Sequence, residues 1–302
     1  MTNKLLIICG PTGSGKSSLA IECAKILNTD IICADSMTIY KGFDVGTAKV
    51  TTEEAQGIRH HLISICEPND AFTVSDYKSR ALSIINELIN QGKTPIICGG
   101  TGFYINSILY DNSYGNSAPN LEVREKYLRL AKESGNEYVY NVLRELDPET
   151  ATKLHFNDVK RVVRALEIYF SGTKKSDIID SQTPVFDYEC YSYNYEREIL
   201  YQRINKRVDD MIRNGLVEEV RNLVLNGAKK ESQSMQAIGY KEILSYLNNE
   251  LSLEDAILLL KQNTRRYSKR QITFFKKIPN IIYLEPNDNV IETAEEITRG
   301  FV

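Results

Sequence analysis

Short apolar runs alternate with longer amphipathic stretches over the first hundred residues of the chain. The apolar runs 5–9, 30–34 and 95–98 have the length and composition of buried strands. Residues 18–27 and 74–90 instead repeat their apolar positions with a helical period of about 3.6 residues, which predicts helices. Because strands that alternate with helices favour a parallel sheet, we predict an α/β core.

The pattern changes after about residue 111. A run of asparagine, serine and glycine at 112–120 is typical of a linker, and helical periodicity dominates from 121 to 170. Helices are again predicted beyond residue 197, with two short strands at 185–195 and 279–284. We therefore divide the chain into a first part of the core, an inserted helical domain and a return to the core, at 1–112, 113–184 and 185–302.

One motif predicts an anion site between the first strand and the first helix. Gly10, Gly15, Lys16 and Ser17 occupy the fixed positions of the P-loop pattern G-x-x-x-x-G-K-[ST]. In this context backbone N–H groups and the helix N-terminus converge on a phosphate. Lys16 is expected to reach a phosphate oxygen and the Ser17 hydroxyl to ligate Mg²⁺. The pattern alone does not distinguish one phosphate compound from another.

Three further positions are candidates for chemistry at the same edge of the sheet. Asp35 follows the second strand, where a carboxylate serves as a base, as a magnesium partner in an ordinary NTPase, or as a cap. Thr101 follows glycines after the third strand, where it binds substrate or caps the next helix. Arg203 and Arg207 share one helix face, which suits either a diphosphate clamp or a solvated surface.

The overall charge gives no indication of a nucleic-acid partner, because 37 basic and 40 acidic side chains leave a formal net charge of −3. RNA binding would therefore require local clusters of basic residues. Segment 265–277 interleaves basic and aromatic residues, and segment 160–164 carries three basic side chains. Each alone is also typical of a solvated helix face, but two such segments beside an anion site favour an RNA substrate.

The cysteines and the apolar runs favour a cytoplasmic protein. None of the six cysteines forms a C-x-x-C pair, so we expect reduced thiols rather than disulfides or a zinc site. The three histidines lack metal-ligand spacing. No apolar stretch is long enough to cross a membrane, and the first strand starts so early that we expect no targeting segment.

Eight short segments occur in order along the chain: 10–17, 35–42, 44–49, 60–63, 99–104, 161–169, 238–240 and 266–273. Together they resemble the tRNA dimethylallyltransferase family, whose members prenylate an adenine beside the anticodon. The departures from the family pattern are modest. Thr38 stands where many members have Gln, Phe274 where Trp is usual, and Phe156 where Pro commonly follows the histidine.

The resemblance implies a P-loop NTPase-like parallel core with an inserted helical domain, and transfer of a dimethylallyl group from dimethylallyl diphosphate to adenine N6. Asp35 would be the general base, Thr101 would contact the diphosphate and support Asp35, and Arg207 would stabilise the leaving group with Mg²⁺ on Ser17. The diphosphate-binding residues would be Gly10, Thr12, Gly13, Ser14, Gly15, Lys16, Ser17 and Arg203.

The resemblance also implies an anticodon stem-loop as the RNA partner, and we expect a monomer. Two alternatives use the same loop, namely prenylation of a free adenine nucleotide and an ordinary P-loop ATPase or kinase. The tRNA-binding residues implied by the family pattern are Asp35, Ser36, Met37, Thr38, Thr101, Lys160, Arg161, Arg164, Gln236, Gly239, Tyr240, Lys241, Lys269, Arg270, Gln271 and Lys276.

Overall fold

The computed structural model describes residues 4–112, 120–178, 181 and 183–301. The chain forms two compact units. Unit 1 comprises Met1–Leu109 and Val185–Val302, and unit 2 comprises Tyr110–Pro184. The observed division falls within three residues of the domain boundaries expected from the sequence, but residues 113–119 of the expected linker lie outside the described residues.

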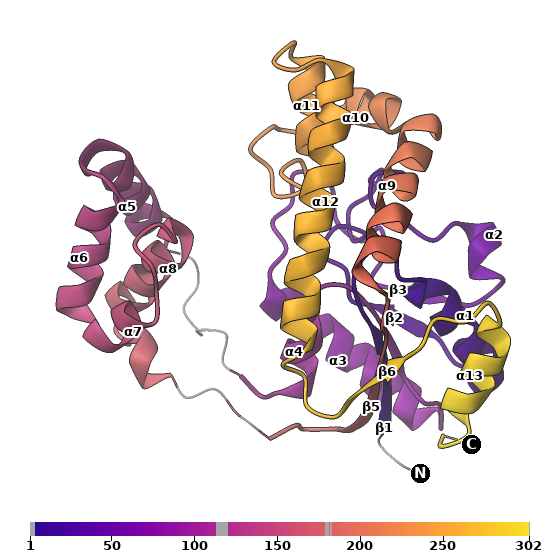
Figure 1. The fold of residues 1–302 in the computed structure, drawn as a ribbon. Helices are drawn as coiled ribbons and strands as arrows, with labels where there is room; N and C mark the ends of the chain where they lie inside the picture. Colours follow the sequence, from indigo (N-terminus) through magenta and orange to yellow (C-terminus); the bar gives the residue numbers. More distant parts are fainter. Residues whose placement is uncertain (1–3, 113–119, 179–180, 182, 302) are drawn as a thin grey trace. The chain divides into compact units, whose positions relative to one another are not determined.

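A parallel sheet forms the centre of unit 1 (Figure 1). Among the described residues it has six strands in the order β3-β2-β4-β1-β5-β6, and every neighbouring pair runs parallel. The α/β class predicted from the sequence is therefore confirmed. The strands are β1 (Lys4–Cys9), β2 (Ile31–Cys33), β3 (His60–His61), β4 (Ile96–Gly99), β5 (Asp187–Tyr193) and β6 (Ile281–Leu284).

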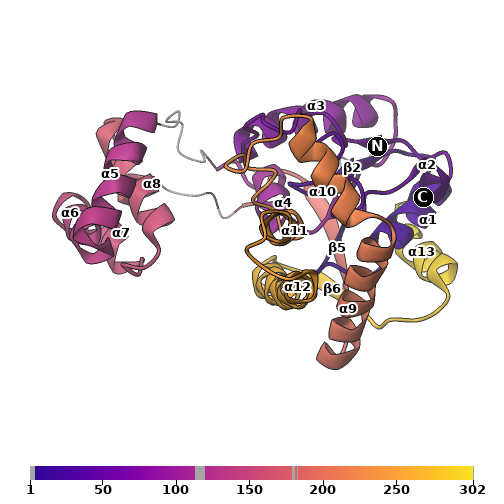
Figure 2. The ribbon, with the colours of Figure 1, turned by 90° about the horizontal axis from the view of Figure 1, so that it is seen from above.

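Helices cover both faces of this sheet. Figures 1 and 2 show α1 and α13 together on one side and α3 and α4 on the other. The α3 helix begins where Thr73 and Asp76 form a reciprocal capping box. The helices of unit 1 are α1 (Lys16–Leu27), α2 (Thr52–Ala55), α3 (Val74–Asn90), α4 (Gly102–Leu109), α9 (Arg197–Arg213), α10 (Leu216–Leu225), α11 (Tyr240–Leu247), α12 (Leu253–Phe275) and α13 (Val290–Thr298).

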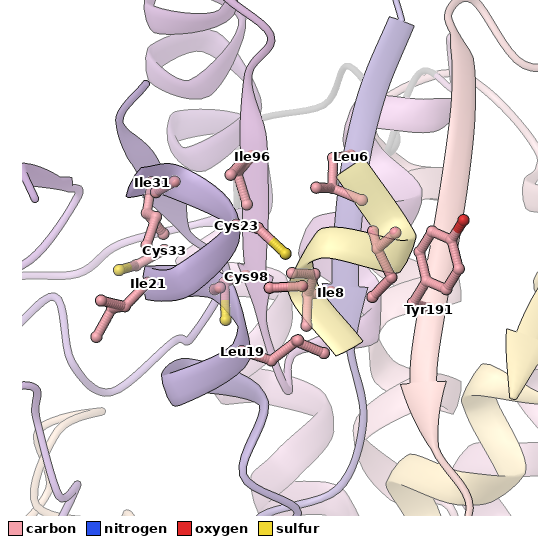
Figure 3. Close-up of a cluster of buried hydrophobic side chains, with 14 of the residues drawn as sticks. Leu6, Ile8, Leu19, Ile21, Cys23, Ile31, Cys33, Ile96, Cys98 and Tyr191 are labelled. Carbon is pink, nitrogen blue, oxygen red and sulfur yellow. The ribbon is translucent and has the colours of Figure 1, made fainter. Parts of the chain in front are cut away.

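The core of unit 1 lies on both faces of the central strands. Figure 3 shows side chains of β1, β2, β4 and β5 packed against α1, with Leu6 and Ile8 of β1 close to Cys23 and Leu19 of α1. Residues of β1 from Leu5 onward are buried on alternate faces, as expected for a parallel strand covered by helices on both sides. This packing fixes the end of β1, from which the phosphate-binding loop starts.

Unit 2 is a small helical bundle with its own core. It contains α5 (Leu121–Ser134), α6 (Asn136–Leu146), α7 (Pro148–Thr152), α8 (Val159–Phe170) and a 3₁₀ turn at Lys175–Asp177. Its buried cluster is apolar and includes Tyr127, Leu143 and Leu166. One buried carboxylate, Glu167 of α8, accepts hydrogen bonds from Arg124 and Arg164. Because a buried charge is costly without such partners, the two arginines help to hold α5 against α8.

Candidate active site

The P-loop occupies the carboxyl end of β1 and leads directly into α1. Gly10, Gly13 and Gly15 have φ angles of 138°, 79° and 88°, which L side chains rarely adopt. A Cβ atom at Gly10 would also lie only 2.9 Å from the Oγ of Ser192. Helix α1 begins at Lys16, so the unpaired N–H groups of its first turn face the end of the loop. This geometry is suited to binding an anion.

Two cavities lie beside the P-loop, and they share three of the predicted site residues. The larger has a volume of about 370 Å³ and the smaller about 70 Å³, and Lys16, Ser17 and Arg207 line both. The smaller one is also lined by Asp35 and Thr38. The structure thus brings together residues that are up to 191 positions apart in the sequence, since α9 carries Arg207 to the loop on which Lys16 lies.

Two cations face these cavities with few partners. Lys16 Nζ donates to the carbonyl oxygen of Pro11 at 3.3 Å, and Arg207 Nη2 donates to that of Thr47 at 3.0 Å. The Nε atom of Arg207 is buried and has no hydrogen-bond partner in the described part of the chain. Burial lowers the pKa of both groups, and the charge of Arg207 lowers that of Lys16 further. A bound anion would stabilise both positive charges and so offset the free-energy cost of their burial.

Asp35 lies just beyond β2, and the hydrogen bonds of its turn hold it in place. Its Oδ1 accepts from the backbone N–H groups of Met37 at 2.8 Å and of Thr38 at 3.4 Å. Thr101, just beyond β4, accepts at Oγ1 from the N–H of Ser36 at 3.0 Å. Two strand ends are therefore tied together at the site. The contact fits the supporting role that the sequence predicted for Thr101, and its contact with a diphosphate stays a prediction.

Helix α12 contributes two side chains to the interior of this site. Gln271 is 5% exposed; its Oε1 accepts from the N–H of Thr12 at 2.9 Å, and its Nε2 donates to the carbonyl of Gly100 at 2.9 Å. The hydroxyl of Tyr267 lies against Thr101 and Gln271, and burial, together with the charge of nearby Asp35, raises its pKa. The sequence did not predict a role for Tyr267 at the site.

The Gln271 side chain is engaged inside the protein, and its contact with tRNA stays a prediction. Both polar ends of this amide are used inside the protein, where they link the P-loop to the segment after β4. The Tyr240 side chain is also engaged inside the protein, since it is fully buried and its hydroxyl donates to Glu219 at 2.6 Å. Gly239 is also buried, and its N–H donates to Glu242. These three residues have structural contacts where RNA contacts were expected.

The two arginines of α9 differ in position. Arg207 lines both cavities, whereas Arg203 is exposed and lines neither. The Nε of Arg203 donates to the carbonyl of Gly13 at 2.8 Å, and its guanidinium lies 4.9 Å from the centre of the Tyr195 ring. Arg203 therefore contacts the outer side of the P-loop in this structure, and its part in the predicted diphosphate clamp stays a prediction.

The remaining predicted RNA contacts are mostly at the surface. Lys269, Arg270 and Lys276 are exposed on and after α12, and Gln236 is exposed before α11. Three others are engaged to different degrees. Lys160 of α8, in unit 2, is exposed and so is Arg161, but Arg161 forms an ion pair with Asp158. Arg164 of the same helix donates to the buried Glu167. Lys241 is half-buried and lies 3.7 Å from a carboxylate oxygen of Glu242.

The cysteines are free, as the sequence predicted, and all six are buried. Burial raises the pKa of the Cys23 thiol to about 12 and that of Cys98, which lines the smaller cavity, to about 11. Such thiols are protonated and unreactive near neutral pH. No helix in the described segments is both long and apolar enough to span a bilayer.

A parallel sheet, a P-loop at its edge and two half-buried cations that share a cavity with a carboxylate define an α/β enzyme that acts on a phosphorylated compound. A family model described as IPP transferase matches residues 38–278. The chain therefore belongs to the IPP transferase family. This confirms the resemblance that the sequence motifs indicated.

Known proteins similar to this chain agree with that assignment. A tRNA dimethylallyltransferase of Thermoanaerobacter pseudethanolicus is 50% identical over 308 residues, which cover all of this chain and 97% of that protein. One of Caldanaerobacter subterraneus subsp. tengcongensis is 48% identical, covering 98% and 96%. Among solved structures, a eukaryotic dimethylallyltransferase acting on tRNA matches with a TM-score of 0.82 at 31% identity, covering 99% of this chain and 78% of that one. A tRNA isopentenylpyrophosphate transferase of Staphylococcus epidermidis matches with a TM-score of 0.73 at 40% identity, covering 99% and 98%.

Proposed function

We propose that this protein transfers a dimethylallyl group from dimethylallyl diphosphate to N6 of the adenine beside the anticodon (position 37) of a tRNA, and releases diphosphate. The names of its relatives, at about half identity over nearly the whole chain, support the reaction class. The observation that carries the proposal is the convergence of Lys16, Arg207 and Asp35 on one cavity at the end of the sheet. That set provides two cations for a diphosphate and one carboxylate for a proton.

The diphosphate would bind between the P-loop and α9. Backbone N–H groups at the start of α1, the Lys16 ammonium and the Arg207 guanidinium are the donors available there. As the allylic C–O bond breaks, negative charge gathers on the leaving diphosphate. Donors that are already fixed around that position stabilise this charge without reorganisation. The unpartnered Nε of Arg207 is the donor best suited to gain a partner at this moment.

We propose Mg²⁺ as the cofactor, with the Ser17 hydroxyl as its protein ligand. Ser17 is exposed at the start of α1 and lines both cavities, so its oxygen adjoins the proposed diphosphate position. Mg²⁺ commonly takes one or two protein oxygens, with substrate phosphates and water completing its shell. These residues therefore fit the ion. When bound, it would offset part of the diphosphate charge.

Asp35 would accept the proton from the attacking amine. The lone pair of N6 forms a bond to the allylic carbon, the C–O bond electrons leave with the diphosphate, and the N6 proton passes to the Asp35 carboxylate. Hydrogen bonds to its Oδ1 from the following turn hold this carboxylate, and the Thr101 contact to Ser36 fixes the same turn. The adenine would have to leave its stack to reach the cavity, so base flipping is expected.

Exposed basic side chains on both units would bind the tRNA anticodon stem-loop. They include Lys269, Arg270 and Lys276 in unit 1 and Lys160 and Arg161 in unit 2. Such contacts position the RNA through its phosphates. We further propose that the protein acts in the cytoplasm as a monomer. Its free, buried cysteines suit a reducing compartment, and one chain supplies every residue of the proposed site.

The decisive experiment incubates the protein with labelled dimethylallyl diphosphate and unmodified tRNA, followed by nucleoside analysis. Label in a prenylated adenosine is the expected result, and it should be lost in Lys16→Ala. Parallel incubations with AMP and with ATP test the two alternatives. Label on AMP but not on tRNA would identify a free-nucleotide prenyltransferase, and ATP hydrolysis without prenyl transfer would identify an ordinary ATPase; either result overturns the proposal.

A further inference from the structure

One half-buried carboxylate outside the proposed site binds the backbone of a loop of unit 1. Glu219 lies on α10, and its Oε2 accepts from the backbone N–H groups of Asp44 at 3.0 Å and Val45 at 2.7 Å. Its Oε1 accepts from the N–H of Gly46 at 3.0 Å and from the Tyr240 hydroxyl at 2.6 Å. Four donors therefore converge on a single side chain.

The other end of the same loop lies at the proposed diphosphate site. The carbonyl oxygen of Thr47, directly after Gly46, accepts the hydrogen bond from Arg207 Nη2. Thr47 and Ala48 line the smaller cavity with Lys16. An anion on α10 thus binds the amides of the loop, while a cation on the preceding helix α9 binds the next carbonyl. Glu219 and Arg207 therefore bind two consecutive residues of the loop, Gly46 and Thr47.

A carboxylate suits this position for a physical reason. Three successive N–H groups in an irregular segment lack strand or helix partners. Val45 and Gly46 are half-buried, so leaving their N–H groups unsatisfied is costly. A carboxylate accepts several bonds at once, and its charge strengthens each of them. The loop backbone lies so close to Tyr240 that only glycine fits at position 46, since a Cβ there would lie 2.6 Å from the Tyr240 ring. The Tyr240 ring in turn packs against Phe43, with centroids 4.4 Å apart.

We propose that Glu219 is a positioning residue for diphosphate binding, which acts by fixing the 44–47 loop and, through Thr47, the Arg207 guanidinium. The inference rests on the proposed function, because it gives Arg207 a diphosphate to bind. Without Glu219 the three N–H groups would lose their acceptor. The loop would then rearrange, and the Thr47 carbonyl would shift away from Arg207. Binding of the diphosphate would weaken, while the basic surface of α12 would stay intact.

The test compares Glu219→Gln with Glu218→Gln, a matched control on the same helix whose exposed carboxylate pairs with Arg221. Glutamine at 219 replaces one acceptor oxygen with a donor that opposes backbone N–H groups. We expect the dissociation constant of inorganic pyrophosphate, measured by calorimetry without tRNA, to rise about tenfold, as for a charged acceptor that loses part of its hydrogen bonding. The Michaelis constant for dimethylallyl diphosphate should rise in parallel, with that for tRNA changed less than about twofold. Glu218→Gln should match the wild type.

Pyrophosphate affinity unchanged in a folded Glu219→Gln protein would overturn the inference, and so would equal losses for both substrates. If this variant does not fold, Tyr240→Phe tests the inference instead, because it removes one of the four hydrogen bonds to Glu219 and keeps the aromatic ring. A two- to threefold weaker pyrophosphate affinity in Tyr240→Phe supports the inference, and wild-type affinity rejects it. Because calorimetry needs no prenyl transfer, failure of the proposed reaction would be seen separately, as tight pyrophosphate binding without labelled tRNA.

Discussion

The Oε1 atom of Gln271 accepts a hydrogen bond from the backbone N–H of Thr12 across 259 positions of sequence. The same amide donates to the carbonyl of Gly100, so one side chain of α12 ties the P-loop to the segment that carries Thr101. Its neighbours Lys269 and Arg270 are exposed on the same helix. A helix with a basic outer surface therefore has its inner surface joined to the anion site.

Replacing Gln271 by Leu should weaken diphosphate binding and leave tRNA affinity intact. The change removes both hydrogen bonds and leaves the half-buried N–H of Thr12 and the buried C=O of Gly100 unpaired. An unpaired buried group costs about 1–3 kcal/mol, and the half-buried one costs less. We expect a lower melting temperature and a higher Michaelis constant for dimethylallyl diphosphate. Filter binding of tRNA provides the comparison. A large loss of tRNA affinity with normal pyrophosphate binding would instead return Gln271 to the RNA interface.

Removing the Asp35 carboxylate should slow the chemical step and spare binding. Asp35→Asn keeps the size of the side chain and an oxygen acceptor for the turn formed with Met37, but it cannot take the N6 proton. The expected loss in the single-turnover rate is about 10²- to 10⁴-fold, the usual contribution of a general base. The dissociation constant of tRNA should stay close to the wild-type value. A wild-type single-turnover rate would exclude Asp35 as the base.

Much of the site could be predicted from sequence because its parts follow strand ends. Lys16, Asp35 and Thr101 each lie just beyond an apolar run, and the carboxyl ends of parallel strands meet at one edge. Gln271 and Glu219 could not be assigned in this way. Their roles depend on which loop their helices pack against, and no local pattern near either residue specifies that loop.

Some secondary-structure elements could not be predicted from the periodicity of apolar residues. β3 is two histidines long, so it shows no alternation of its own and is defined by its pairing with β2. The buried Tyr240 shows a different limit of sequence motifs, which do not reveal which of their side chains are buried. Segment 238–240 resembles a family segment that implies RNA contacts, and the tyrosine within it packs between Phe43 and the loop at Gly46. Sequence patterns locate a segment but do not say which side of it faces inward.

Arg270→Ala should weaken tRNA binding and flatten its dependence on salt. An arginine that neutralises one phosphate contributes about one unit or slightly less to the slope of log K against log salt. The measurement is tRNA affinity between low and moderate salt, with Arg221→Ala as the control because that exposed arginine lies on α10 and pairs with Glu218. An unaltered slope in Arg270→Ala would remove this residue from the phosphate contacts.

The pH dependence of diphosphate binding should reveal the titration of Lys16. Burial lowers the pKa of this ammonium from the usual lysine value of 10.5, and the nearby Arg207 charge lowers it further. A bound diphosphate favours the charged form of Lys16, so its affinity should be full below the lowered pKa and should fall as pH rises through it.

The stability of the protein without ligand should have the opposite dependence on pH. The unfolded chain binds the proton more tightly, so the free energy of unfolding should rise with pH until the pH reaches the usual lysine pKa of 10.5. Pyrophosphate calorimetry and denaturant unfolding at several alkaline pH values test both signs, and Lys16→Met should show neither trend. A pyrophosphate affinity that is equally flat with pH in wild type and Lys16→Met would show that this ammonium does not contact the anion.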